Sequence, residues 1–111
     1  MVELEKVKPG DWLKVEVDGH FFELQVVYPT ATNILFIQKG NRVRIDPRKC
    51  FGIEITDEWM RKLSFTLDNG YWTLDGVNWE QSQLEDLKYV HLLQRETEYI
   101  KNIQSKSGCE F

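Results

Sequence analysis

Tight turns between short runs of alternating apolar and polar residues are the feature that most constrains this chain. Three are the dipeptides Asp18-Gly19, Asn69-Gly70 and Asp75-Gly76, and a fourth is Lys39-Gly40-Asn41. Dipeptides of this kind accept positive φ angles and therefore join neighbouring strands into hairpins. The chain is expected to consist largely of antiparallel hairpins.

The first half predicts five short strands. Residues 12–17 alternate apolar and polar positions, and residues 20–28 place Phe22, Leu24, Val26 and Tyr28 on one face. Residues 33–37 are apolar on both faces and fit a central strand. Residues 42–45 return with two arginines outward, and Phe51, Ile53 and Ile55 suit a fifth strand. Together with the Pro9-Gly10-Asp11 opening, this pattern is typical of a small SH3-like β-roll or barrel.

The second half predicts a helix–meander–helix arrangement. Thr56 can cap a short helix that carries two acids at its start. Three strands joined by tight turns follow as an antiparallel meander. Ser82 and Glu85 match a capping box, which predicts one long helix from about Gln83 to Ile103.

The expected fold is α+β with two subdomains and a tail. The SH3-like β-barrel is predicted at residues 1–55, the helix–meander–helix subdomain at 56–104, and a flexible tail at 105–111. The 111 residues carry a formal net charge of −4 and 41% hydrophobic residues, which suits one modest core. No run of about 18 apolar residues or signal-like start is present. We therefore expect a cytoplasmic protein that does not enter membranes.

No reactive constellation appears in the sequence. His20 follows a hairpin turn, and His91 lies in the predicted long helix among apolar neighbours. Neither of the two cysteines, Cys50 and Cys109, has a histidine beside it in the sequence, and two are too few for a disulfide scaffold. We predict no catalytic residues, no metal site, no cofactor and no enzymatic activity.

A basic segment offers one candidate binding site. Residues 38–49 carry a local charge of +4, whereas the segments before and after them are net acidic. Arg42 and Arg44 lie two apart on one strand and so share a face. Such a patch suits nucleic-acid phosphates, and the alternative is a solvated strand face that prevents aggregation. Its members are Lys39, Arg42, Arg44, Arg48 and Lys49.

Aromatic and apolar residues offer a second candidate, a protein interface. Tyr71 and Trp72 are neighbours on one strand and must face opposite ways. Exposed aromatics commonly anchor interfaces, although core packing accounts for most of these residues. The candidate interface consists of Trp12, Trp59, Tyr71, Trp72, Trp79, Leu84 and Leu87.

Two segments carry a resemblance to a protein group. They are residues 55–65, with Thr56-Asp57-Glu58-Trp59 at their start, and residues 88–95, with Lys88-Tyr89-Val90-His91. Here the chain resembles small uncharacterised proteins of Bacteroidetes bacteria and of their phages and prophages. The chain departs from that group in a meander shorter by about one hairpin and in its ending. The resemblance implies a phage-associated accessory protein and assigns no role to any residue.

The sequence therefore predicts a non-catalytic interaction protein, in the setting of a phage or prophage factor that acts on a host protein. Nucleic-acid binding through residues 39–49 is the first alternative. A protein that sequesters a small molecule or nucleotide is the second, and it would need an enclosed pocket with a cationic lining. A protein partner is expected, and self-association is left open.

Overall fold

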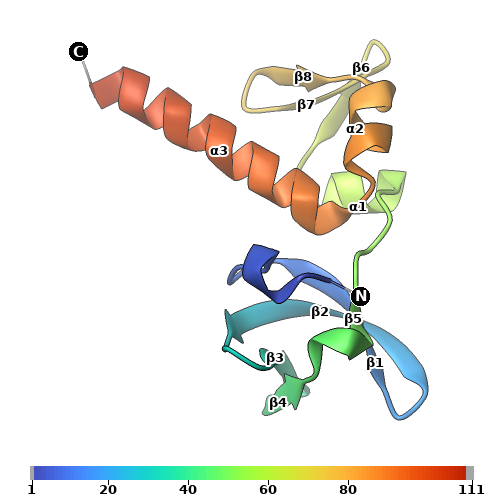
Figure 1. The fold of residues 1–111 in the computed structure, drawn as a ribbon. Coiled ribbons are helices and arrows are strands. Elements are labelled where there is room, and N and C mark those ends of the chain that lie inside the picture. The colour runs from blue at the N-terminus through green and yellow to red at the C-terminus, as the bar shows by residue number, and fades with distance from the viewer. Residues whose placement is uncertain (1, 110–111) are drawn as a thin grey trace. The chain divides into compact units, whose positions relative to one another are not determined.

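The computed structural model describes the backbone of residues 2–109 and the side chains of residues 2–101. The chain divides into two compact units, Met1–Ile53 (unit 1) and Glu54–Phe111 (unit 2). Within the described residues it holds eight strands in two antiparallel sheets and three α-helices, so the α+β class is confirmed (Figure 1). None of these helices has the length and apolar character needed to span a membrane.

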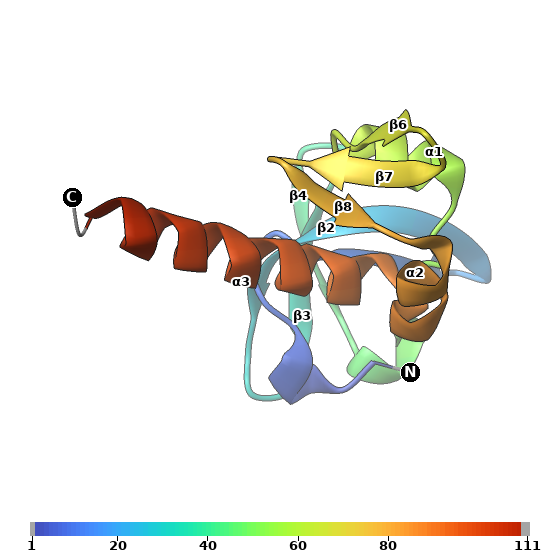
Figure 2. The ribbon, with the colours of Figure 1, turned by 90° about the horizontal axis from the view of Figure 1, so that it is seen from above.

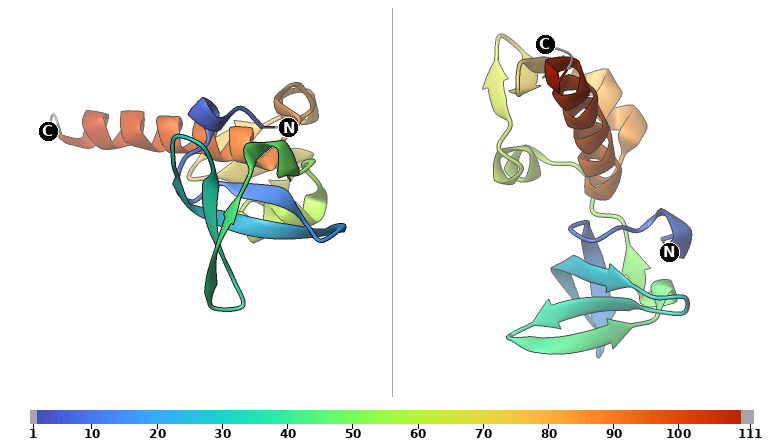
Figure 3. Two further views of the ribbon diagram at one scale, coloured as in Figure 1. Left: turned by 60° about the horizontal axis from the view of Figure 1, so that its bottom comes forward. Right: turned by 90° about the vertical axis from the view of Figure 1, so that its left-hand side faces the viewer.

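Unit 1 is a five-stranded sheet with strand order β4-β3-β2-β1-β5. The long strand β2 is shared by two halves of the sheet, because its first six residues pair with β1 and its last four run beside β3. Figure 3 shows the β3–β4 hairpin, drawn in cyan to green, extending as an arm from the rest of the unit. In chain order the elements are η1 (Leu4–Lys6), β1 (Trp12–Val17), β2 (His20–Pro29), β3 (Ile34–Gln38), β4 (Asn41–Ile45), η2 (Pro47–Lys49) and β5 (Cys50–Phe51).

The hairpin turns of unit 1 have the backbone geometry that their sequences favour. Asp18 and Lys39 have φ angles of 51° and 52°, and the glycine after each also has a positive φ. Two successive positive φ angles match the right-handed twist of the flanking strands. The second turn is tighter than predicted, since Gln38 pairs directly with Asn41 across the two residues Lys39 and Gly40.

The core of unit 1 lies on one side of its strands. Leu13, Val15, Ile34, Phe36 and Cys50 are fully buried there. Because successive strand residues point to opposite faces, their neighbours form a second, outward side that carries polar, aromatic and arginine residues. The buried or partly buried residues that pack around this core include Val2, Val7, Val26, Leu24 and Val43.

The predicted orientation of Tyr28, near the end of β2, is wrong. Periodicity places Tyr28 with Phe22, Leu24 and Val26, but the pairing register shifts between Val26 and Tyr28. Such a bulge puts one extra residue in the strand and reverses the alternation beyond it. Tyr28 therefore pairs with Leu35 on the outward side and is 59% exposed.

Unit 2 contains the expected short helix and meander. The Thr56 hydroxyl accepts a hydrogen bond from the backbone N–H of Trp59 at 3.2 Å and so caps the first helix. The meander has the strand order β6-β7-β8. The elements are α1 (Asp57–Lys62), β6 (Thr66–Asp68), β7 (Tyr71–Leu74), β8 (Val77–Trp79), α2 (Gln81–Leu87) and α3 (Val90–Cys109).

The prediction of one helix over residues 83–103 is wrong, because two helices meet at Lys88 (Figure 2). Lys88 has φ 69° and ψ −48°, and the N–H of Tyr89 bonds back to the carbonyl of Leu87 at 2.8 Å. This is a γ-turn of the rare, strained form. Tyr89 instead forms a β-bridge with Glu54, and the helix is interrupted between Leu87 and Val90.

The start of the helical region also differs from the prediction. The cap is Glu80 rather than Ser82, and the Gln83 side chain accepts a hydrogen bond from the Glu80 backbone N–H at 2.7 Å. At the other end, α3 continues through Cys109, where the sequence predicts a tail from Ser105. Residues 110 and 111 of that tail lie outside the described residues.

Candidate binding surface

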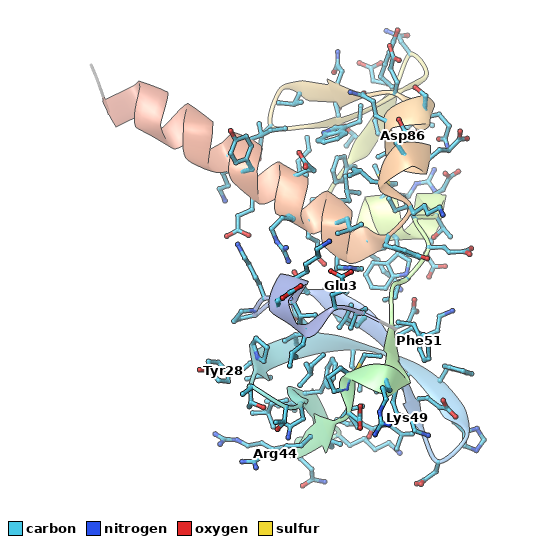
Figure 4. All side chains as sticks on the ribbon, in the orientation of Figure 1. Glu3, Tyr28, Arg44, Lys49, Phe51 and Asp86 are labelled. Atoms are coloured by element: carbon cyan, nitrogen blue, oxygen red, sulfur yellow. The ribbon has the colours of Figure 1, made fainter. Side chains whose placement is uncertain are left out.

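The structure separates the five basic candidates into two groups. Arg48 lies in η2, where its Nη2 is 2.7 Å from an Asp46 carboxylate oxygen, and this contact lowers the pKa of Asp46 to about 2. Lys49 follows, 4.0 Å from Glu16. Arg42 and Arg44 lie instead on the outward side of β4, after Lys39 in the turn, and all five are exposed. Figure 4 shows Arg44 and Lys49 projecting from different parts of unit 1.

Arg42 and Arg44 have apolar cross-strand neighbours. Arg42 pairs with Ile37 and Arg44 with Leu35, which pairs in turn with Tyr28 on the next strand. Directly paired side chains on one face lie about 5 Å apart at their Cβ atoms. No carboxylate of the described residues lies within ion-pair distance of either arginine. We call this surface the Arg42 face, and its members are Val27, Tyr28, Leu35, Ile37, Arg42 and Arg44.

Several apolar side chains of the Arg42 face are exposed to solvent. Val27, Tyr28 and Ile37 are 41%, 59% and 51% exposed, and Figure 4 shows Tyr28 and Arg44 pointing outward on the same side of unit 1. A shallow concavity of about 370 Å³ adjoins it, lined by Val27, Ile37 and neighbouring residues of β1 and β2 that include Trp12. A contiguous apolar surface rimmed by charge is typical of an interaction site.

A smaller aromatic cluster lies on the other half of the sheet's outward side. The rings of Phe21 and Phe51 meet edge to face with centroids 6.2 Å apart. The Lys14 ammonium lies 5.9 Å from the Phe21 centroid. Phe21 remains 59% exposed, so this cluster extends the apolar outward surface of unit 1.

Most of the predicted interface residues form the interior of unit 2. Trp72, Trp79 and Leu84 belong to its buried cluster, and Trp59 is buried as well. Cations cover two of these rings, with Arg61 5.5 Å from the Trp72 centroid and Lys62 4.8 Å from that of Trp59. Of the seven candidates, Tyr71 is exposed, whereas Trp12 and Leu87 are half-buried.

Sequence reasoning did not select the apolar members of the Arg42 face. The exposure of Ile37 could have been predicted, because a strand that is apolar on both sides must expose one side if nothing covers it. The exposure of Tyr28 could not have been predicted in this way, because its orientation depends on the bulge. Tyr99 of α3 and Leu67 of β6 are further exposed residues that the sequence did not indicate.

Cys50 and His91 are both buried and in uncharged forms. Burial raises the pKa of the Cys50 thiol to about 12, with a further contribution from Asp46. Burial, together with the nearby Arg95 charge, lowers the pKa of His91 to about 4. The His91 ring stacks on the Tyr89 ring, with their centroids 5.9 Å apart. The Nδ1 atom of His91 has no hydrogen-bond partner among the described residues.

Unit 2 carries an open concavity of about 320 Å³ beside the junction of α2 and α3. Its charged lining consists of Glu54, Glu85 and Lys88, and Tyr89 contributes an aromatic wall. Two carboxylates against one ammonium differ from the cationic lining that a nucleotide-sequestering protein would need. In the part of the chain that the structure describes, no cluster of three or more His, Cys, Asp or Glu side chains could hold a metal ion.

Comparisons with known proteins give no relative from which a role could be transferred. No protein-family model, curated protein or solved structure matches the chain.

Proposed function

We propose that this chain is a non-catalytic binding protein whose docking surface is the Arg42 face of unit 1. The same proposal describes unit 1 as an SH3-like barrel. Its strand order, the sharing of β2 between two half-sheets and the short η2 turn before β5 support that description. The resemblance to proteins of Bacteroidetes and their phages favours a phage or prophage accessory factor that acts on a host protein.

The observation that carries the proposal is the contiguous exposure of Val27, Tyr28 and Ile37 beside two arginines. Each of these apolar side chains would bury further area on contact, at about 25 cal/mol per Å² of apolar surface removed from water. Aromatic residues and arginine are also the types enriched at protein interfaces. The Arg42 face combines these residue types on neighbouring strands of one sheet.

The test compares capture of proteins from host lysate by the full chain and by two variants. Ile37→Ser removes the centre of the Arg42 face, and Tyr99→Ser is the matched control on an exposed residue of unit 2. A partner retained by the wild type and by Tyr99→Ser, but lost from Ile37→Ser in nuclease-treated lysate, agrees with the proposal. Equal retention by all three chains contradicts it.

Nucleic-acid binding is the second candidate, and one specific observation favours it. Arg42 and Arg44 have no carboxylate of the described residues in ion-pair range, and Tyr28 lies on the same face. Phosphates could meet the arginines while a base stacks on the exposed ring. Fluorescence anisotropy with a labelled oligothymidine at low salt tests this. Binding that falls steeply with salt and is lost in Arg42→Glu/Arg44→Glu would favour it over a protein partner.

A further inference from the structure

We propose that the open edge of β4 accepts an extended acidic segment of a partner protein as an added strand, with its carboxylates on Arg42 and Arg44. This inference rests on the proposed function and names the partner chemistry of the same surface. It starts from a difference between the two edges of the sheet. The backbone N–H of Val2 bonds to the carbonyl of Cys50 at 2.9 Å, so a neighbouring segment partly covers the β5 edge.

The β4 edge has no such cover within the described part of unit 1. Among the described residues, no backbone or side-chain hydrogen bond joins residues 41–45 to any segment other than β3. Figure 3 shows no other ribbon of unit 1 running along the outer edge of β4. A row of free N–H and C=O groups of this kind is a template for a further strand.

The register identifies which residues offer those groups. Gln38 and Asn41 close the two-residue turn as a hydrogen-bonded pair. Hydrogen-bonded and non-hydrogen-bonded pairs alternate along an antiparallel ladder. Val43 therefore directs its backbone groups toward β3, whereas Arg42 and Arg44 direct theirs toward the open edge.

The side chains of the same two arginines set the chemistry of the added strand. They lie two residues apart on one face, about 7 Å along the strand. A strand paired with β4 would place its own alternate side chains beside them at the same spacing. Arginine binds carboxylates through two parallel N–H bonds, so acidic residues at positions i and i+2 fit best. The residue between them would lie beside the half-buried Val43, which favours an apolar side chain.

Charge makes a second copy of β4 the less suitable occupant. In an antiparallel pair centred on Val43, Arg42 of one copy would lie opposite Arg44 of the other, and directly opposed like charges destabilise a sheet. A nucleic acid could bind the guanidinium groups through its phosphates, but it would not supply the regular hydrogen-bond partners that a strand offers to the outward backbone groups. The near balance of unit 1, eight basic against seven acidic residues, also gives little general attraction for a polyanion.

The experiment measures binding of labelled peptides to the full chain by fluorescence anisotropy. The probe is an acetylated and amidated Thr-Glu-Val-Glu-Val-Glu-Thr peptide, and a Lys-for-Glu peptide and an oligothymidine serve as comparison ligands. Arg42→Gln/Arg44→Gln should weaken binding of the acidic peptide by about tenfold or more, because two charge-assisted contacts are lost. Arg48→Gln is the matched control, since Arg48 is exposed but lies outside β4, and it should change binding less than twofold.

Two N-methylated forms of the probe separate strand addition from charge attraction alone. Methyl groups on the glutamate nitrogens block the N–H groups that would face β4 in an antiparallel pair, whereas methyl groups on the valine nitrogens point away. We expect binding to be lost in the first form and retained in the second. Equal binding of the two forms, or tighter binding of the oligothymidine than of the peptide, overturns the inference. The Ile37→Ser capture test remains independent, so a docking surface without strand addition would be recognised.

Discussion

Replacing Lys88 by glycine should stabilise the protein, although it deletes a side chain from the junction of two helices. Lys88 holds φ 69° and ψ −48°, a backbone conformation that its Cβ disfavours. Strain of this kind costs about 1–3 kcal/mol in a non-glycine residue. Glycine would relieve it but would add about 0.5–1 kcal/mol of unfolded-state entropy. The expected net gain is therefore about 1 kcal/mol in the free energy of unfolding.

Lys88→Ala is the matched control, because alanine lacks the lysine side chain but keeps the Cβ. The Lys88 side chain is exposed, so Lys88→Ala should change stability by less than about 0.5 kcal/mol. Urea unfolding followed by tryptophan fluorescence measures the free energy of unfolding of both variants. In thermal unfolding, the melting temperature of Lys88→Gly should be higher than that of the wild type by about 4 °C. If Lys88→Gly is less stable than Lys88→Ala, the γ-turn is not a site of Cβ strain and the reasoning fails.

Three further outcomes follow from burial. Trp72→Ala should destabilise by about 3–5 kcal/mol and its exposed neighbour Tyr71→Ala by less than 1 kcal/mol, as urea unfolding would measure. Burial lowers the pKa of His91 to about 4 in the folded chain, whereas an unperturbed histidine has a pKa of about 6.5, so the unfolded chain binds the extra proton. The free energy of unfolding should therefore decrease as the pH is lowered from about 6.5 to about 4, and this part of the pH dependence should be absent from His91→Gln. In a Cys109→Ser background, iodoacetamide at pH 8 should modify Cys50 slowly without urea and rapidly in it, because burial keeps the thiol protonated and covered.

The hairpins of this chain were predictable because their determinants are local. An aspartate or asparagine followed by glycine specifies a two-residue turn, and the alternation on either side specifies which face is buried. The cap of α1 was predictable for the same reason, since a threonine side chain serves an amide three residues away. The division of Tyr71 and Trp72 between surface and interior also follows from strand geometry alone.

The errors occur where contacts distant in sequence override local pattern. The pattern of residues 83–103 predicts one helix, but the bridge between Glu54 and Tyr89 and the hydrogen bond from the Ile55 N–H to the Lys88 carbonyl hold the junction out of the helix. The bulge near Val27 is likewise a property of the pairing between β2 and β3. The basic segment divides into two groups for another reason, because Arg48 and Lys49 have acidic neighbours in Asp46 and Glu16.

The two arginines on β4 have two explanations that make different demands on side-chain chemistry. Protection of an open edge against self-pairing requires only charge, so lysine would serve as well as arginine. Recognition of carboxylates on an added strand requires the planar guanidinium, because lysine offers a point charge without the paired N–H geometry. Arg42→Lys/Arg44→Lys should therefore remain as resistant to self-association as the wild type in light scattering, yet bind the acidic peptide more weakly. Undiminished peptide binding by this variant would mean that charge alone accounts for both residues.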